Sequence, residues 1–195
     1  MRTFVRHQLR PAVLVLLLLT LITGVAYPAL VTAVAQTVFP QQANGSLIAT
    51  ADGRVVGSSL IGQSFSDPAY LWGRPSAAGK DGYDANASGG SQLGPTSQAL
   101  IDRVSAEVDR LRAANGSGAP IPVDLVTTSA SGLDPQISPA AAEYQVVRIA
   151  TARGISTEAV RAAIARHTDG PLLGFIGEPA VNVLLVNLDL DGLLS

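Results

Sequence analysis

The chain has 195 residues, of which 47% are hydrophobic and 14% charged, and its formal net charge at pH 7 is −2. Without the three arginines among the first ten residues, the remainder carries 10 basic and 15 acidic residues. This net charge of −5 argues against a nucleic-acid partner, because phosphates require a basic face. The absence of cysteine excludes disulfides and thiolate metal sites.

The N-terminal segment is predicted to cross a membrane. No charged residue occurs between Arg10 and Asp52, and a helix over 13–34 would be roughly 33 Å long, enough for a hydrocarbon core of about 30 Å. Arg2, Arg6 and Arg10 precede it without an acidic residue, which favours a cytoplasmic N-terminus. The expected organisation is a cytoplasmic N-terminus at 1–10, a transmembrane helix at 11–35 and an extracytoplasmic domain at 36–195.

A cleaved signal peptide is the alternative for this segment. Ala33-Val34-Ala35 has the small-x-small pattern that precedes a cleavage site, and Pro28 would end the apolar helix at a suitable distance. Against cleavage, the apolar run at 13–30 exceeds the roughly 7 to 15 residues of a signal-peptide core. We therefore expect a retained anchor. Both alternatives place the same domain outside the membrane.

The exported domain is predicted to begin with a hairpin and a long loop. Asp52-Gly53 forms a favoured two-residue turn between two apolar runs. Residues 70–96 are dense in Gly, Ser, Asn and Asp, and so long a loop inside a compact domain is commonly functional or disordered. Its aromatic residues, among them Trp72 and Tyr83, favour an ordered loop because they can anchor it to a surface.

A helix is predicted from a cap at Thr96 to about residue 114. Apolar residues recur along one face of it, at positions 100, 104, 108 and 111. The charged residues off this stripe are expected to form a solvated face: Arg103, Glu107, Arg110 and Arg112. After a Gly- and Pro-rich break, "VDLVTTS" from Val123 predicts a short strand.

The stretch "SASGLDPQISP" at 129–139 combines small polar residues with two prolines. Ser138 followed by Pro139 predicts a helix start, because serine caps a helix and proline suits its first position. This helix is expected to end at Gly154, which suits a left-handed C-terminal cap. The stretch is therefore interpreted as a shaped loop that leads into a helix.

The C-terminal part contains one further helix and one ambiguous segment. Ser156 or Thr157 is expected to begin a helix that ends near His167. The segment 181–190 suits a helix after Pro179 but also contains the β-branched residues of a strand; we favour the helix. The predicted fold class is an α+β extracytoplasmic domain preceded by a single N-terminal transmembrane helix.

Residues suited to catalysis are scarce in the exported domain. Its only histidine, His167, lies at a predicted helix end, where a basic side chain complements the helix C-terminus. No G-x-S-x-G motif occurs, and Lys80 belongs to no Ser-x-x-Lys pair. The glycine-rich stretch at 87–94 lacks the Gly-Lys-Ser/Thr ending of a P-loop, and the aspartates lack the spacing of a calcium loop. The glycine-rich segments thus indicate rigid shapes and not reaction centres.

Several long segments resemble one family, the C subunit of the bacterial Kdp potassium-transporting ATPase (KdpC family), over nearly the whole chain. Besides the N-terminal apolar segment they are, in order, "GSSLIGQSF" at 57–65, "YLWGRPSA" at 70–77, "YDANASGGSQLGPTS" at 83–97, "PVDLVTTSASGLDPQISPAAAEYQVVRIATARG" at 122–154 and "VNVLLVNLDLD" at 181–191. The sequence departs from the usual family pattern at Gln92, Gln136 and Asp189, where the family tends to have Asn, His and a small residue.

The resemblance implies a non-catalytic accessory subunit of a high-affinity, ATP-driven potassium uptake system in the bacterial inner membrane, needed for assembly of the complex. The implied partners are a potassium-channel-like subunit, an ATP-hydrolysing P-type subunit and a small single-span subunit. The family is also described as a catalytic chaperone that raises the ATP affinity of the hydrolysing subunit. ATP and potassium are thus expected to act through the complex, with no cofactor bound directly by this chain.

The candidate site residues are expected either to shape loops or to face a partner subunit: Trp72, Arg74, Tyr83, Ser88, Gly89, Gly90, Ser91, Ser129, Ser131, Gly132, Asp134, Gln145 and Arg148. Ser129, Ser131 and Asp134 either brace their loop or contact an ion, and we favour bracing because a single carboxylate makes a poor potassium site. Two other function classes stay open. One is an anchored hydrolase that uses His167, and the other is a secreted or anchored binding module. Because the predicted topology separates the domain from cytoplasmic nucleotide, we expect it to bind ATP negligibly.

Overall fold

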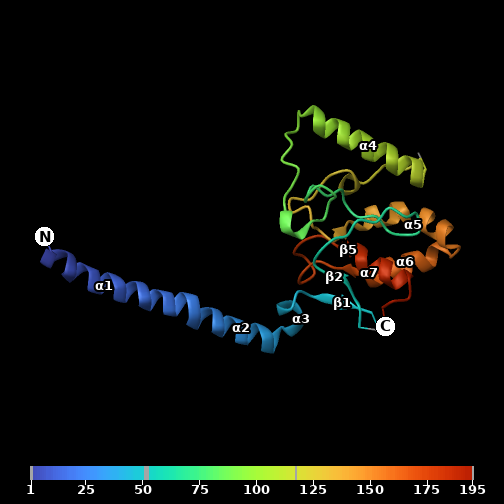
Figure 1. The fold of residues 1–195 in the computed structure, drawn as a ribbon. Helices are drawn as coiled ribbons and strands as arrows, with labels where there is room; N and C mark the ends of the chain where they lie inside the picture. The colour runs from blue at the N-terminus through green and yellow to red at the C-terminus, as the bar shows by residue number, and fades with distance from the viewer. Residues whose placement is uncertain (1, 51–52, 117, 195) are drawn as a thin grey trace. The chain divides into compact units, whose positions relative to one another are not determined.

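The computed structural model describes residues 2–50, 53–116 and 118–194 and divides into two compact units, the first ending at Leu47 and the second beginning at Ile48 (Figure 1). The second unit mixes helices with short strands. The predicted class, α+β with one long apolar helix at the N-terminus, is confirmed. The predicted turn at Asp52-Gly53 lies partly outside the described residues, although the strands on either side of it pair with each other.

The N-terminal unit is one nearly continuous helix. It consists of α1 (Arg2–Leu21), a π-helical turn η1 (Ile22–Ala26), α2 (Tyr27–Val38) and the short α3 (Pro40–Ala43). The stretch His7–Val38 is long and apolar enough to cross a membrane. Pro28 does not end the helix as the signal-peptide alternative supposed. Proline lacks an N–H and cannot donate an i→i−4 hydrogen bond. The helix continues through Pro28 because the bonding directly before it widens to the π pattern, in which the Tyr27 N–H donates to the Ile22 carbonyl.

The second unit contains two small sheets and four longer helices within its described residues. The elements are β1 (Leu47–Ala49), β2 (Val55–Ser58), η2 (Ala85–Ala87), α4 (Gln98–Asn115), η3 (Val123–Leu125), β3 (Gln136–Ile137), α5 (Pro139–Arg153), α6 (Thr157–Arg166), β4 (Thr168–Asp169), β5 (Ala180–Asn182) and α7 (Val183–Leu190). Strands β1 and β2 form one sheet, and β5 lies between β3 and β4 in the other. Both pairings of β5 are antiparallel, with Ile137 and Thr168 opposite Val181.

The caps predicted for α5 and α6 are present. The Ser138 hydroxyl accepts a hydrogen bond from the Ala141 N–H at 3.1 Å, and the Ser156 hydroxyl accepts one from the Ala159 N–H at 3.2 Å. Helix α5 ends at Gly154, whose φ of 65° is the predicted left-handed conformation. Local cap chemistry therefore sets both helix starts and the end of α5.

Two local predictions, the strand from Val123 and the cap at Thr96, need correction. The strand expected from Val123 is instead the 3₁₀ turn η3, because Pro122 precedes it and the Asp124 carboxylate is held by the Ser138 N–H at 2.7 Å. Helix α4 begins after Ser97, since Thr96 lies inside the turn that joins the Ser97 N–H to the Gly94 carbonyl.

The ambiguous C-terminal segment is both strand and helix. Strand β5 ends at Asn182, whose side-chain oxygen caps α7 by accepting a hydrogen bond from the Leu185 N–H at 3.1 Å. The favoured single helix was therefore correct only for the second part.

Helix α5 lies at the centre of the hydrophobic core. Val146 and Ile149 are fully buried, together with Leu111 of α4, Val160 of α6 and Val186 of α7. Helix α5 packs against α4, α6 and β5, and α7 packs against α6 and β5 (Figure 1). A helix covered on several sides needs apolar residues around most of its circumference. The two polar exceptions on α5 that are buried, Gln145 and Arg148, belong to the site described next.

Candidate functional site

The indole ring of Trp72 lies between two guanidinium groups. Arg110 of α4 is 4.4 Å from the ring centroid and Arg148 of α5 is 4.0 Å away, both in cation–π geometry. The Trp72 Nε1–H donates to the Asp67 carbonyl at 2.9 Å, and the side chain is only 5% exposed. Trp72 therefore joins the long loop to the helical core, and it is not presented to solvent.

Two buried amide side chains hold the backbone on which Trp72 stands. The Gln145 side chain accepts from the Trp72 N–H at 2.9 Å and donates to the Trp72 carbonyl at 3.0 Å. The Asn187 side chain does the same for Leu71, at 2.7 and 3.0 Å. The amides thus satisfy the buried backbone groups as a neighbouring β-strand would.

Arg148 completes this attachment. It donates to the Asn115 side chain at 2.9 Å, to the Tyr70 carbonyl at 3.0 Å and to the Gln145 side chain at 2.6 Å. Burial, together with the neighbouring Arg110, lowers the pKa of Arg148 to about 10, so the group stays charged at neutral pH. A buried charge with this many acceptors fixes the loop instead of offering a free cation.

The long loop is also tied to the "SASGLDPQISP" stretch through Arg74. Its guanidinium pairs with the Asp134 carboxylate at 3.3 Å and donates to the Thr128 carbonyl at 3.2 Å. The second carboxylate oxygen of Asp134 accepts from the Gln136 N–H at 3.0 Å. Both oxygens of this carboxylate are therefore engaged inside the domain.

Ser76 and Tyr83 extend the same connection. The Ser76 hydroxyl donates to the Gly132 carbonyl at 2.6 Å and accepts from the Tyr83 N–H at 2.8 Å. The Tyr83 hydroxyl donates to the Arg74 carbonyl at 2.6 Å. Burial, reinforced by the Asp134 charge and opposed by Arg74, raises the pKa of Tyr83 to about 12. The phenol is thus held in its neutral, hydrogen-donating form.

Close backbone contact between the two loops requires glycine. The Gly89 N–H donates to the Ser131 carbonyl at 2.8 Å, and the Ser88 hydroxyl donates to the same carbonyl at 3.0 Å. The Gly132 N–H donates to the Ser129 hydroxyl at 2.9 Å. Gly132 has a φ of 67°, and a Cβ there would lie 2.6 Å from the Gly89 carbonyl oxygen. The two loops, 70–96 and 129–138, are hereafter called the braced loops.

The remaining candidates lie at the edge of this contact. A Cβ on Gly90 would be 3.1 Å from the Ala130 carbonyl oxygen, and Ser91 follows it in a partly exposed position. Ser131 is exposed and its hydroxyl accepts from the Leu133 N–H at 3.1 Å. The structure thus brings all the predicted site residues except Ser91 into the contacts that hold the braced loops together or to the core.

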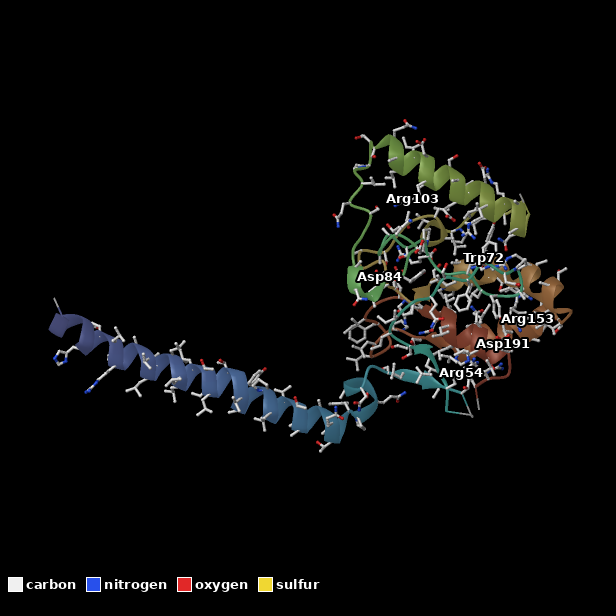
Figure 2. The ribbon with its side chains drawn as sticks, viewed as in Figure 1. Arg54, Trp72, Asp84, Arg103, Arg153 and Asp191 are labelled. Atoms are coloured by element: carbon white, nitrogen blue, oxygen red, sulfur yellow. The ribbon has the colours of Figure 1, made fainter. Side chains whose placement is uncertain are left out.

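A cavity of about 430 Å³ lies between α4 and residues 63–83. Four basic side chains line it, with two acidic ones: Arg74, Lys80, Arg103, Arg110, Asp81 and Glu107. The buried Nε of Arg103, which lies between α4 and the loops in Figure 2, has no acceptor among the described residues. Lys80 is exposed, and it forms no ion pair with any other residue that the structure describes. We call this feature the basic cavity.

The basic cavity corrects one prediction from the sequence. The four charged residues at positions 103, 107, 110 and 112 of α4 were expected on a solvated face. Arg110 and Arg112 are exposed as expected, whereas Arg103 and Glu107 are half-buried; all but Arg112 line the cavity. Sequence reasoning missed the cavity because its walls come from segments far apart in the chain. The one available signal was the repeat of charged residues at helical spacing, three and four apart, beside the apolar stripe.

A second cavity of about 470 Å³ lies beside the "SASGLDPQISP" stretch and is lined by Asp124, Asp134 and Glu178 among other residues. The Asp124 carboxylate accepts from the Ser138 N–H, and Asp134 is paired as described above. In the part of the chain that the structure describes, no three His, Cys, Asp or Glu side chains are grouped to hold a metal ion. The geometry favours bracing over ion contact for this stretch.

His167 belongs to an ion-pair cluster. Its Nε2 is 2.9 Å from the Asp189 carboxylate, and Arg166 pairs with the same oxygen at 2.9 Å. Its backbone N–H caps the end of α6. Among the described residues no serine hydroxyl is hydrogen-bonded to this ring, so the arrangement does not resemble a nucleophile and its base.

The loop between β4 and β5 carries a further feature that sequence reasoning missed. Four large apolar side chains are exposed there: Leu172 by 68%, Leu173 by 76%, Phe175 by 76% and Ile176 by 49%. The run "PLLGFIG" at 171–177 contains no charged or polar side chain, and this was the signal available in the sequence. Residues 170–177 are hereafter called the apolar loop.

Comparison with known proteins gives a consistent result. The family model described as the K⁺-transporting ATPase c chain, KdpC, matches residues 9–192. The potassium-transporting ATPase KdpC subunit of Sorangium cellulosum (strain So ce56) is 63% identical over 186 residues, covering 95% of this chain and 97% of that protein. The same subunit of Polaromonas naphthalenivorans (strain CJ2) is 58% identical over 189 residues, covering 96% of each. The resemblance inferred from the motifs is therefore confirmed.

Proposed function

Because this chain belongs to the KdpC family of K⁺-transporting ATPase c chains, we propose that it is an accessory subunit that docks onto its partners in a Kdp complex and performs no hydrolysis itself. The partners proposed are a potassium-channel-like subunit, an ATP-hydrolysing P-type subunit and a small single-span subunit. The observation that carries the proposal is the preformed surface of the braced loops beside the basic cavity. A rigid surface loses little conformational entropy on docking.

The proposed topology places this surface outside the cytoplasm. Arginines occur at positions 2, 6 and 10, at the N-terminal end of the apolar stretch His7–Val38. No acidic residue occurs among the first ten residues. Such a bias favours a cytoplasmic N-terminus in a bacterial inner membrane. The domain boundaries proposed remain 1–10, 11–35 and 36–195, with the last part extracytoplasmic.

Any effect of this subunit on the ATP affinity of the hydrolysing subunit, as described for the family, is proposed to act through assembly. The Gly89 amide in the glycine-rich stretch already donates to the Ser131 carbonyl, so it is not available to a phosphate. The proposed topology also keeps the domain away from cytoplasmic nucleotide. We therefore expect the full chain in detergent micelles to bind Mg-ATP negligibly by calorimetry.

A saturable site tighter than about 1 mM, roughly −4 kcal/mol, would contradict this expectation. The basic cavity is the place where such binding would arise. Loss of the heat signal in Lys80→Glu, but not in Arg112→Glu, would then assign the nucleotide to the cavity.

Co-purification from membranes tests the docking proposal. A tagged chain should recover the potassium-channel-like and ATP-hydrolysing subunits. Lys80→Glu reverses a charge at the rim of the basic cavity and should reduce the recovery several-fold. Arg112→Glu makes the same charge change on the exposed side of α4 and should leave recovery unchanged.

The outcomes separate two parts of the proposal. Recovery of the wild-type chain without other subunits would overturn the accessory role. Equal recovery with both variants would leave that role standing and remove the basic cavity from the docking surface.

A further inference from the structure

We infer that the apolar loop inserts into the lipid surface of the membrane to which the chain is anchored, and so forms a second membrane contact. The inference goes beyond the proposed docking function and depends only on the membrane anchor. It begins from exposure: Leu173 and Phe175 are each 76% exposed at the tip. Elsewhere in the second unit, the described large hydrophobic residues that are exposed occur one at a time along the chain. A continuous apolar group of this kind marks an interaction surface.

The backbone of the apolar loop is partly suited to lipid, because four of its N–H groups are paired within the loop. The Leu172 N–H donates to the Ile176 carbonyl and the Ile176 N–H to the Leu172 carbonyl, both at 2.9 Å. The Gly174 and Phe175 N–H groups donate to the Pro171 and Leu172 carbonyls, at 3.0 and 3.3 Å. Hydrocarbon offers no partner for a free N–H, so internal pairing is the property that a lipid-inserted loop requires.

The side chains of the loop favour lipid over a protein groove. From Pro171 to Gly177 no side chain carries a hydrogen-bonding group, whereas protein interfaces combine an apolar centre with polar contacts that set orientation. The flanking residues, Asp169 and Glu178, are acidic and offer no attraction to anionic headgroups. Insertion should therefore depend on apolar burial, and it should not weaken with salt.

The length of the connection keeps the domain near the bilayer. Helix α2 ends at Val38 and the second unit begins at Ile48. The intervening residues, 39–47, span at most roughly 30 Å when fully extended. The domain is therefore confined close to the membrane surface, and even a weak lipid contact is favoured by the high local concentration of lipid.

The experiment uses the absence of cysteine from the chain. Phe175→Cys in the full chain provides one labelling site for an environment-sensitive dye. After reconstitution into vesicles of phosphatidylcholine and phosphatidylethanolamine, without other subunits, the dye should show blue-shifted emission and quenching by lipids brominated in their chains. Both signals should persist at about 0.5 M salt, because the attraction is not ionic. Ser105→Cys, on the exposed side of α4, is the matched control and should report water.

The outcomes are decisive for this inference. Emission typical of water from position 175 in vesicles would overturn it. Shielding that appears only after the other subunits are added would also overturn it and would assign the loop to a protein contact. The docking proposal is tested separately, since Phe175→Ser should leave co-purification in detergent unchanged, whereas Lys80→Glu at the rim of the basic cavity should reduce it.

Discussion

The braced loops and the apolar loop are held in place by different means. The braced loops depend on side chains from distant segments, such as the Gln145 amide on Trp72 and the Ser76 hydroxyl on Gly132. The described bonds inside the apolar loop, in contrast, join its own backbone groups over a few residues. A loop held by tertiary contacts should lose its shape with the core, whereas a loop held by local bonds should tolerate side-chain changes. Four predictions test this difference, in order of decreasing effect.

Trp72→Ala should cause the largest loss. It removes a ring that is 5% exposed and stacked between Arg110 and Arg148, and it leaves a cavity in the core. We expect the free energy of unfolding to fall by about 3–5 kcal/mol, measured by urea denaturation of the full chain with circular dichroism as the probe. Val123→Ala, at a 71% exposed apolar position, is the control and should change it little. A loss below about 1 kcal/mol for Trp72→Ala would mean that the braced loops are not coupled to the core.

Gly132→Ala should destabilise the domain by about 2–3 kcal/mol. The φ of 67° is unfavourable for alanine, and the added Cβ would lie 2.6 Å from the Gly89 carbonyl oxygen. Gly94→Ala is the matched control, because a Cβ there meets no atom within 4 Å and its φ is not in the left-handed region. Equal stability of the two variants by the same denaturation assay would contradict the close packing of the braced loops.

Tyr83 should make stability fall at high pH. Because folding raises the pKa of Tyr83 from its ordinary value near 10 to about 12, its contribution is complete below pH 10 and is lost as the pH rises towards 12. We expect a loss of about 1–2 kcal/mol across this window, discounted for partial solvent access. Tyr83→Phe should be less stable at neutral pH and should lack this part of the pH dependence. An unchanged profile in the variant would assign the alkaline loss to other groups.

Phe175→Ser should have the smallest effect. The side chain is 76% exposed, and the hydrogen bond of its residue to the Leu172 carbonyl uses only the backbone. The change in the free energy of unfolding should stay below about 0.5 kcal/mol. A loss comparable to that of Gly132→Ala would show that the apolar loop is part of the core, and the contrast between the two kinds of loop would disappear.

The helix boundaries were the most predictable part of the fold. Ser138, Ser156 and Gly154 act within a few residues of their own position, so the sequence reveals them directly. The strand predicted from Val123 was wrong because its local preference is overridden by the Asp124 contact with Ser138, 14 residues away. The caps of α5 and α6 were therefore predicted accurately from neighbouring residues, whereas the turn from Gly94 to Ser97 moved the start of α4 past the predicted cap at Thr96.

The candidate site was predictable only as a set of loops. The composition of the braced loops indicated rigid shapes, but many of the bonds that hold them join distant residues, from 43 positions apart for Ser88 with Ser131 to 116 for Leu71 with Asn187. The basic cavity was missed for the same reason. Because Trp72 is buried, weaker assembly of a Trp72→Ala variant with partner subunits would arise largely from loss of the fold and would not identify a contact of Trp72 with a partner.

The π-helical turn at Ile22–Ala26 has a consequence for the neighbours of the anchor within the membrane. Wider i→i+5 bonding adds one residue to the turn and so rotates the following helix by about 100° relative to an uninterrupted α-helix. A stripe of residues that packs against another subunit on the N-terminal side of the turn therefore continues, beyond Tyr27, on a different set of positions. Alanine or tryptophan scanning of His7–Val38 should show a periodic pattern whose phase jumps once, between residues 22 and 27.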